Sequence, residues 1–106
     1  GTNFLLMNPS VLGPEIVLFT TKTGTYTALT TDKVIIGNHA TVAFSITLMP
    51  ATGSGRVLEF ANIGAAAVTI DGDASETING ATTLVLAQWE RCKLLDHASG
   101  LWVRLA

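Results

Sequence analysis

The sequence predicts an all-β protein, an antiparallel β-sandwich of jelly-roll type with about eight strands. Thr, Val, Ile and Leu are abundant, and apolar residues alternate with a period of two, which is the side-chain period of a strand. Clusters of Gly, Asp, Asn and Ser divide the chain into short segments at the ~8 to 12-residue spacing typical of antiparallel sandwiches and barrels. Signals for amphipathic helices are nearly absent.

The N-terminal segment differs from the rest of the chain. Residues 1–14, GTNFLLMNPSVLGP, contain Pro9, Gly13 and Pro14 and are predicted to form an extended arm. The β-sandwich domain is therefore assigned to residues 15–106. Three short strands are predicted at its start: EIVLF, TYTAL and KVIIG.

The clearest strand is TVAFSITLMP, residues 41–50. Its alternation places one set of apolar side chains on the same face: Val42, Phe44, Ile46 and Leu48. Pro50 ends this strand because proline has no N–H to donate to the ladder. The small residues of ATGSG, residues 51–55, then form a turn.

Two further strands, RVLEFANI and AAVTIDG, precede a short segment, ETI, that ends in Asn79-Gly80. This dipeptide suits a tight hairpin with positive φ at both central residues. TLVLAQWERCKLL, residues 83–95, is long enough for two strand segments or for one strand with a bulge near Gln88. DHASG is predicted to turn the chain, and LWVRL closes it with its leucines and valine inward: Leu101, Val103 and Leu105.

The composition favours an oligomer. Apolar residues make up 48% of the 106 residues and charged residues 13%, about half of the ~25% usual in soluble domains. Mean hydropathy is +0.46. No stretch reaches the ~18 to 20 apolar residues of a membrane-spanning helix, and the N-terminus lacks the pattern of a secretory signal, so no membrane insertion is expected. An obligate interface would account for the apolar excess.

The charges are few and scattered. The net charge is −2, and only Arg91 and Lys93 among the basic residues lie close together. This distribution excludes the electrostatic footprint of a nucleic-acid or anionic-membrane surface. Cys92 is the single cysteine, so an intrachain disulfide is excluded, and its alternation with Glu90 and Leu94 predicts a small buried residue.

A series of weak motifs follows in fixed order over residues 25–106. They are a short strand with Asp-x-Val-Ile, an apolar strand ending near Leu and Pro, a Gly-rich turn into a strand that ends in Asn, then Val-Thr-Ile, Ile-Asn-Gly and a last Gly-x-Trp. The matching positions are Asp32, Val34, Ile35, Ile46, Leu48, Pro50, Gly55, Arg56, Asn62, Val68, Thr69, Ile70, Ile78, Asn79, Gly80, Leu84, Leu86, Leu94, Gly100 and Trp102. This order resembles the small β-domain of tail-fibre and tailspike proteins from tailed bacteriophages. Two loops depart from the family pattern, at Leu48-Met49-Pro50 and at DHASG.

The resemblance implies a virion structural protein. Such domains commonly assemble as parallel homotrimers in the adsorption apparatus, so a homotrimer in the virion tail, assembled in the host cytoplasm, is expected. The implied partners are other copies of the chain, other virion proteins and a host cell-surface polysaccharide or protein receptor. The implied function is host attachment through receptor binding.

No catalytic constellation is evident. A glycosidase needs two carboxylates facing each other at ~5 to 9.5 Å. Asp71 and Asp73 are close in sequence, but DGDAS is more simply a polar turn. We therefore expect no catalytic residue and no enzymatic activity.

Metal and cofactor signals are equally weak. His39, His97 and Cys92 lack the spacing of a compact zinc motif. Asp71-Gly72-Asp73 lacks the remaining ligands of a twelve-residue calcium loop. We expect no cofactor and no metal, with one minor alternative: a metal held on a trimer axis by three copies of His39 or His97.

The aromatic residues supply the contact candidates. On strict alternation Trp102 shares a face with Arg104, and Trp89 shares one with Arg91. Arg stems lying over aromatic rings suit a subunit interface, which we favour over an exposed sugar-binding strip. The predicted interface or ligand-contact residues are Trp89, Trp102, Arg91, Arg104 and Tyr26.

Three functions fit these observations. A trimeric tail-fibre or tailspike domain is the first. A monomeric carbohydrate-binding module and a capsid-decorating protein are the alternatives. A fibre domain should be a stable free trimer, whereas a binding module should be monomeric, with tryptophan fluorescence that changes on sugar binding.

Overall fold

The computed structural model describes residues 16–106, so the arm predicted for residues 1–14 lies outside the described residues. The described chain is all-β, as predicted. Its strands are β1 (Phe19–Lys22), β2 (Tyr26–Thr27), β3 (Val34–Gly37), β4 (Phe44–Thr47), β5 (Val57–Asn62), β6 (Val68–Asp71), β7 (Thr77–Ile78), β8 (Thr83–Leu86), β9 (Arg91–Ala98) and β10 (Leu101–Arg104). In this part of the chain no helix is long and apolar enough to cross a membrane.

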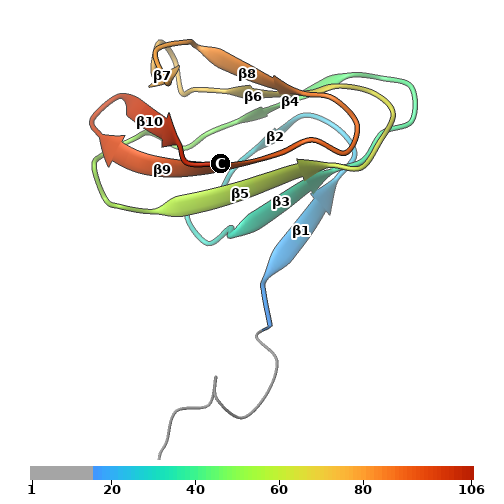
Figure 1. Cartoon of the computed structure of the whole chain (residues 1–106), viewed down its shortest axis with the longest axis horizontal. Coiled ribbons are helices and arrows are strands. Elements are labelled where there is room, and N and C mark those ends of the chain that lie inside the picture. Colours follow the sequence, from blue (N-terminus) through green and yellow to red (C-terminus); the bar gives the residue numbers. More distant parts are fainter. Residues whose placement is uncertain (1–15) are drawn as a thin grey trace, which may run out of the picture.

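The strands form two sheets stacked as layers (Figure 1). One sheet has six strands in the order β1-β3-β5-β9-β10-β7, and the other has four in the order β2-β4-β6-β8. From β1 to β8 the chain changes sheet at every connection. Each odd-numbered strand and the even-numbered strand after it therefore form one coil, and the coils stack as in a solenoid.

The strand directions correct the predicted antiparallel sandwich. β1, β3 and β5 run parallel, as do β2, β4 and β6. Antiparallel pairing begins only where β8 joins β6 and where β9 joins β5 and β10. An alternation of period two is common to parallel and antiparallel strands. The difference lies in the connections, because each parallel pair among β1 to β6 is joined through a strand of the opposite sheet instead of a hairpin.

The core fills the space between the two layers. Its largest fully buried apolar side chains are Trp102, Phe60, Ile35, Ile46, Leu48, Leu58, Ile70, Leu86, Leu94 and Val68. The register aligns Ile35, Phe60 and Cys92 across three neighbouring strands of the six-stranded sheet. Burial of each large side chain contributes about 1.5 to 3 kcal/mol. Cys92 is buried as well, so the prediction of a small buried cysteine is confirmed. This burial raises the pKa of the Cys92 thiol to about 11.

Gly37, the last residue of β3, faces this core. A Cβ at this position would lie 2.6 Å from Cγ2 of Val68 and 3.2 Å from Cζ of Phe44. The contact with Val68 is too short for two carbon atoms, so a larger residue at this position would force Val68 to shift.

Several predicted turns are confirmed. Asn79 and Gly80 have φ of 52° and 89°, the positive values expected for this tight turn. The two strands that flank this turn do not form a hairpin with each other, because β7 belongs to the six-stranded sheet and β8 to the four-stranded sheet. Residues 83–95 contain two strands, β8 and the start of β9, instead of one bulged strand.

The C-terminal hairpin differs from its prediction. Asp96 and His97 lie inside β9, so the turn is confined to Ser99 and Gly100. Trp102 is the inward-facing residue of β10, whereas Leu101 and Val103 are only partly buried and Leu105 is 53% exposed. The predicted alternation is present, but its inner and outer faces are exchanged. A tryptophan buries more apolar area than leucine or valine, so its burial decides the orientation.

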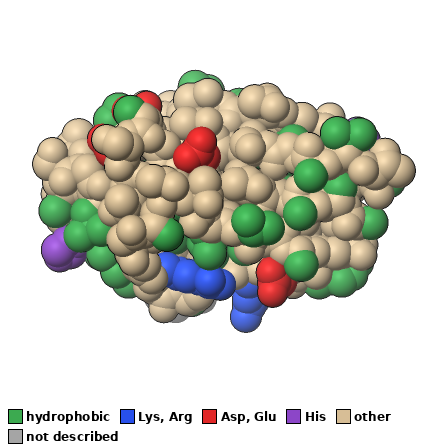
Figure 2. Space-filling view, turned by 90° about the horizontal axis from the view of Figure 1, so that it is seen from above, with side chains coloured by type: hydrophobic (Ala, Val, Ile, Leu, Met, Phe, Trp, Pro, Cys, Tyr) green, Lys and Arg blue, Asp and Glu red, His purple; other side chains and the backbone are tan. Residues whose placement is uncertain are grey.

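The outer faces of the two sheets differ in chemistry. The four-stranded sheet presents short polar side chains, aligned by the register: Ser45, Thr47, Thr69, Asp71 and Thr83, with Val85 beside them. The six-stranded sheet presents larger ones: Val34, Ile36, Val57, Glu59, Arg91, Lys93, Leu95 and Val103. The view in Figure 2, from the side of β7 and β8, shows few charged side chains, with the basic ones confined to one margin.

Candidate functional site

The structure separates the two tryptophans that the sequence grouped as contact candidates. Trp102 is 0% exposed, and within residues 16–106 its indole Nε1 has no hydrogen-bond partner. A side chain sealed inside one subunit cannot contact a partner or a ligand. The prediction for Trp102 is therefore wrong, and this residue belongs to the core.

Tyr26 also serves the fold. Its ring packs against the core, and Nζ of Lys22 lies 4.2 Å from the ring centroid. The phenol donates a hydrogen bond of 2.6 Å to Oδ2 of Asp32, which also accepts the backbone N–H of Leu29 at 2.8 Å. The bond to Asp32 is the largest of the effects that raise the pKa of Tyr26 to about 12. Tyr26 thus fixes the loop between β2 and β3.

Arg91 and Arg104 are exposed and lie together near the C-terminal residue. Nη2 of Arg104 donates to the backbone carbonyl of Arg91 at 3.2 Å, and its Nε donates to the carbonyl of Ala106 at 3.0 Å. Arg91 also lines a hollow of about 230 Å³ with Glu59 and Lys93. These two arginines form a basic margin on β9 and β10, and within residues 16–106 neither guanidinium lies over a tryptophan ring.

Trp89 occupies an exposed turn between β8 and β9. Its side chain is 74% exposed, and its φ is 70°. The left-handed region is uncommon for a bulky residue and is maintained only where the surroundings enforce it. Residues held in this way cluster at functional sites. The exposure and the backbone together make Trp89 the leading candidate for a contact residue.

Hydrogen bonds enforce the Trp89 conformation. The N–H of Trp89 donates to the carbonyl of Asn62 at 2.6 Å, and that of Glu90 donates to the carbonyl of Ala87 at 3.0 Å. Oε1 of Glu90 accepts the N–H of Ala87 at 2.8 Å. Nε2 of Gln88 donates to the carbonyl of Ile63 at 3.2 Å. The indole is therefore presented to solvent on a fixed turn.

Asn62, the last residue of β5, organises this part of the molecule. Its side chain is 0% exposed. Its Nδ2 donates to the carbonyls of Ala66 and Leu86 at 2.9 and 3.0 Å, and its Oδ1 accepts the N–H of Gly64 at 3.0 Å. Asn62 was not among the site residues predicted from the sequence. A polar residue that continues the inward alternation of the buried Leu58 and Phe60 was the available signal.

His39 belongs to the next connection, residues 38–43. Its Nδ1 accepts the N–H groups of Thr41 and Val42 at 3.1 and 2.9 Å, and its carbonyl accepts the N–H of Ala66 at 3.0 Å. The histidine therefore stabilises the connection. His97 lies on β9 and is exposed. Among the described residues no group of three potential metal ligands occurs.

These connections lie at one end of the layered sheets, which we call the Asn62 end: residues 38–43, 63–67 and 87–90. Its exposed apolar side chains are Val42, Ile63 and Trp89. An indole flanked by aliphatic side chains offers a rigid, amphipathic contact area that suits the apolar face of a sugar ring or a protein side chain. Oε1 of Glu90 is hydrogen-bonded within the turn. The surface therefore offers contact area for a ligand, but its residues include no second carboxylate that could face Glu90, as a glycosidase would need.

At the opposite end of β5 and β9 a second buried polar residue, Asp96, holds the loop of residues 51–56. Asp96 is 2% exposed. Its Oδ1 accepts the N–H groups of Thr52 and Gly53 at 2.9 and 2.7 Å, and its Oδ2 accepts the hydroxyls of Ser54 and Thr52 at 2.6 and 3.3 Å. Burial raises the pKa of Asp96, but these hydrogen bonds outweigh burial and hold the pKa below its usual value.

The predicted polar turn at Asp71-Gly72-Asp73 follows β6. The N–H of Glu76 donates to the carbonyl of Asp73 at 2.9 Å and closes the turn. Oε1 of Glu76 accepts the N–H of Ala51 at 2.8 Å. The Glu76 carboxylate thus supports loop structure.

No protein-family model matches this chain, and no significant match was found among curated proteins or solved structures.

Proposed function

We propose that this chain is a virion structural domain of a phage tail fibre or tailspike that assembles as a homotrimer and takes part in host attachment. It acts by binding and not by catalysis. The proposal combines the order of sequence motifs with three properties of the molecule: an apolar surface on β9 and β10, an exposed tryptophan on a fixed turn, and carboxylates engaged in loop structure.

The proposal rests mainly on the outward direction of the apolar residues at the C-terminus. Leu95, Leu101, Val103 and Leu105 define what we call the β9–β10 patch. In an isolated subunit Leu105 is exposed and the other three side chains are partly exposed to water, while the outward positions of the four-stranded sheet are mostly Ser and Thr. Arg91 and Arg104 lie beside the patch. Apolar residues bordered by arginine are typical of subunit interfaces.

Trp89 is the receptor-contact residue in this proposal. It lies at the Asn62 end, and its 74% exposure leaves the indole free to stack on a polysaccharide or a receptor side chain. A homotrimer presents three such turns on one rigid body. Several weak contacts made together give strong attachment without a tight single site.

Light scattering on a sizing column tests the assembly. We expect a mass of three chains that stays constant when the concentration changes about tenfold. Val103→Glu places a charge in the β9–β10 patch and should produce a monomer. Val85→Glu is the matched control, because Val85 is an exposed valine on the outer face of the other sheet and should leave the mass unchanged. A monomeric native chain at every concentration would contradict the proposal.

The exposure of Trp89 also favours one alternative, a monomeric carbohydrate-binding module. That function predicts a native monomer whose tryptophan fluorescence changes with added glycan. The change should disappear in Trp89→Ala and persist in Val85→Ala. A trimer that shows the same glycan response supports the fibre domain instead.

A further inference from the structure

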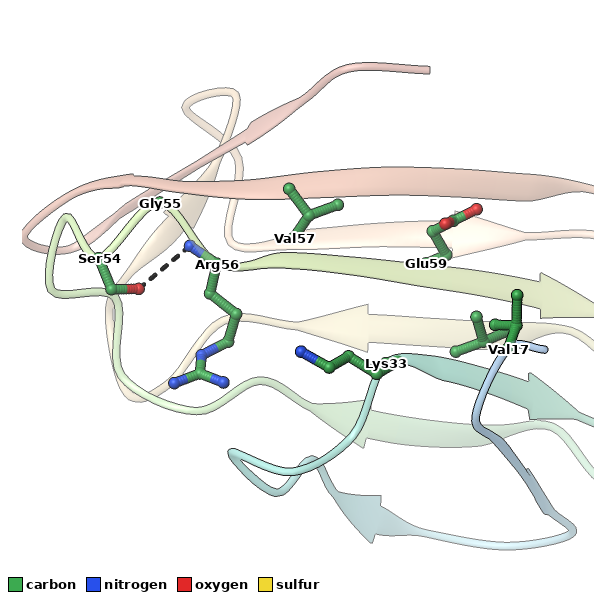
Figure 3. A pocket seen from close by; sticks show the side chains of 8 residues that line it. Val17, Lys33, Ser54, Gly55, Arg56, Val57 and Glu59 are labelled. Atoms are coloured by element: carbon green, nitrogen blue, oxygen red, sulfur yellow. Dashed lines mark hydrogen bonds between the residues drawn. The ribbon is translucent and has the colours of Figure 1, made fainter. Parts of the chain in front are cut away.

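A second potential binding surface lies at the Asp96 end, away from Trp89. It is an open groove of about 580 Å³ on the outer face of the six-stranded sheet (Figure 3). The residues that line it come from β3, β5 and the connections before them: Lys33, Val34, Ser54, Gly55, Arg56, Val57 and Glu59, with Val17 at one side. No proposed interface residue of the β9–β10 patch is among them.

Two cations project into this groove from fixed backbone positions. The carbonyl of Lys33 accepts the N–H of Glu59 at 3.0 Å, and the carbonyl of Arg56 accepts the N–H of Asp96 at 2.8 Å. Nη1 of Arg56 donates to the carbonyl of Thr30. Figure 3 shows the ammonium of Lys33 directed toward the side of the groove that holds the Arg56 guanidinium. The two positive groups therefore share one end of the groove.

The carboxylates closest to Lys33 and Arg56, in sequence or across the strand ladder, do not pair with these two cations. Asp32 accepts hydrogen bonds from Tyr26 and Leu29. Asp96 accepts four hydrogen bonds from the loop of residues 52–54. Figure 3 shows the Glu59 carboxylate directed away from the Lys33 ammonium. Within residues 16–106 neither cation of the groove has a carboxylate oxygen within 4.0 Å.

We propose that this groove binds an oxyanion carried by a saccharide, with Lys33 and Arg56 as its cationic donors. Nε and Nη2 of Arg56 are not used by the Thr30 contact, and together they match the two oxygens of a carboxylate or phosphate. The Lys33 ammonium supplies a second charge. Val57 and Val17 offer apolar contact to the carbon skeleton of the carrier. The choice of a saccharide as carrier rests on the proposed attachment function, whereas the oxyanion follows from the two cations.

Amide NMR spectra of the full chain test this site. The probes are an oligogalacturonate, inorganic phosphate and a neutral dextran oligosaccharide. We expect the oligogalacturonate to shift the amides of Lys33, Val34 and residues 54–57, and we expect the dextran to leave them unchanged. Arg56→Gln and Lys33→Gln should each weaken binding about tenfold, the loss expected for one charge-assisted hydrogen bond. Higher salt should weaken it further.

Lys93→Gln is the matched control, because it removes the same charge from the neighbouring hollow of the same sheet. Binding should be unchanged in this variant. Binding of phosphate without oligogalacturonate supports the oxyanion site and overturns the saccharide carrier. The proposal is overturned if neither anion shifts these amides, or if the control loses as much affinity as the groove variants. A native trimer with an inert groove would retain the attachment proposal and refute this one.

Discussion

The two ends of the β5–β9 ladder are organised by different chemistry. Asn62 at one end and Asp96 at the other are both buried, and each side chain holds a connection between the sheets. The amide of Asn62 donates to two carbonyls and accepts one N–H. The carboxylate of Asp96 only accepts, from two N–H groups and two hydroxyls.

This difference accounts for the composition of the two connections. A carboxylate selects a loop rich in donors, and ATGSG supplies two hydroxyls and unhindered N–H groups. An amide can join backbone groups of both kinds, so the GAAA sequence at residues 64–67 needs no polar side chain. It follows that one end of the molecule depends on a titratable group, while the other end depends on a neutral amide.

The largest effect is expected at the amide. Asn62→Ala leaves the N–H of Gly64 and the carbonyls of Ala66 and Leu86 without their partner in the core. Each unsatisfied group costs about 1 to 3 kcal/mol, so the free energy of unfolding should fall by at least about 3 kcal/mol. Urea denaturation followed by circular dichroism measures the change. Asn38→Ala, at an exposed asparagine, is the control and should change stability by less than about 0.5 kcal/mol. Equal losses of stability in the two variants would show that the buried Asn62 side chain contributes no more to stability than the exposed Asn38 side chain.

A smaller effect with a pH signature is expected at the carboxylate. The pKa of Asp96 is lowered in the folded state, so its contribution is fully present above the unfolded pKa of 3.8. That contribution is lost as the pH falls through the folded pKa. Asp96→Asn should therefore lower the free energy of unfolding by about 2 kcal/mol at neutral pH, and the gap from the native chain should narrow below about pH 4.

Urea denaturation of both chains at several pH values measures this gap. Asn62→Ala provides the comparison, because its loss should be the same at each pH at which the chain folds. A gap for Asp96→Asn that is independent of pH would show that the charge of Asp96 does not stabilise the loop.

The smallest effect is a gain, at the turn that the amide end supports. Trp89→Gly relieves the left-handed backbone and loses few contacts, so stability should rise by about 1 kcal/mol. Trp89→Ala removes the same ring but keeps a Cβ in the left-handed region, and it should be nearly neutral. Thermal unfolding separates the two variants. If both raise stability equally, the exposed ring and not the backbone is the source of the strain.

Sequence alone could predict the local properties of this fold. Alternation placed Phe44, Ile46 and Leu48 on one face, and all three are buried, although Val42 at the start of the same pattern is exposed. The Asn79-Gly80 turn has the expected positive φ. The parallel stacking could not be predicted, because strand direction depends on connections that cross between sheets and leave no trace in the alternation. In β10 both faces contain large apolar residues, so the pattern alone could not decide which face is inside.

The site was predictable to a smaller degree. Trp89 was selected as an interface or ligand-contact residue, but its position on an exposed turn follows from the division of residues 83–95 into two strands. Asn62 and Asp96 act through burial and through partners distant in sequence, up to 44 residues away for Asp96. Such partners become apparent only when the coils are stacked. The Lys33–Arg56 groove has the same origin, since its two cations come from successive coils.

The contrast between the two tryptophans has a spectroscopic consequence. An indole in a dry apolar core emits at shorter wavelength than one surrounded by water, so Trp102 and Trp89 should contribute blue and red components to one emission spectrum. A soluble quencher should extinguish the red component alone. The native chain thus contains two optical reporters, one for the integrity of the core and one for events at the exposed turn, without any added label.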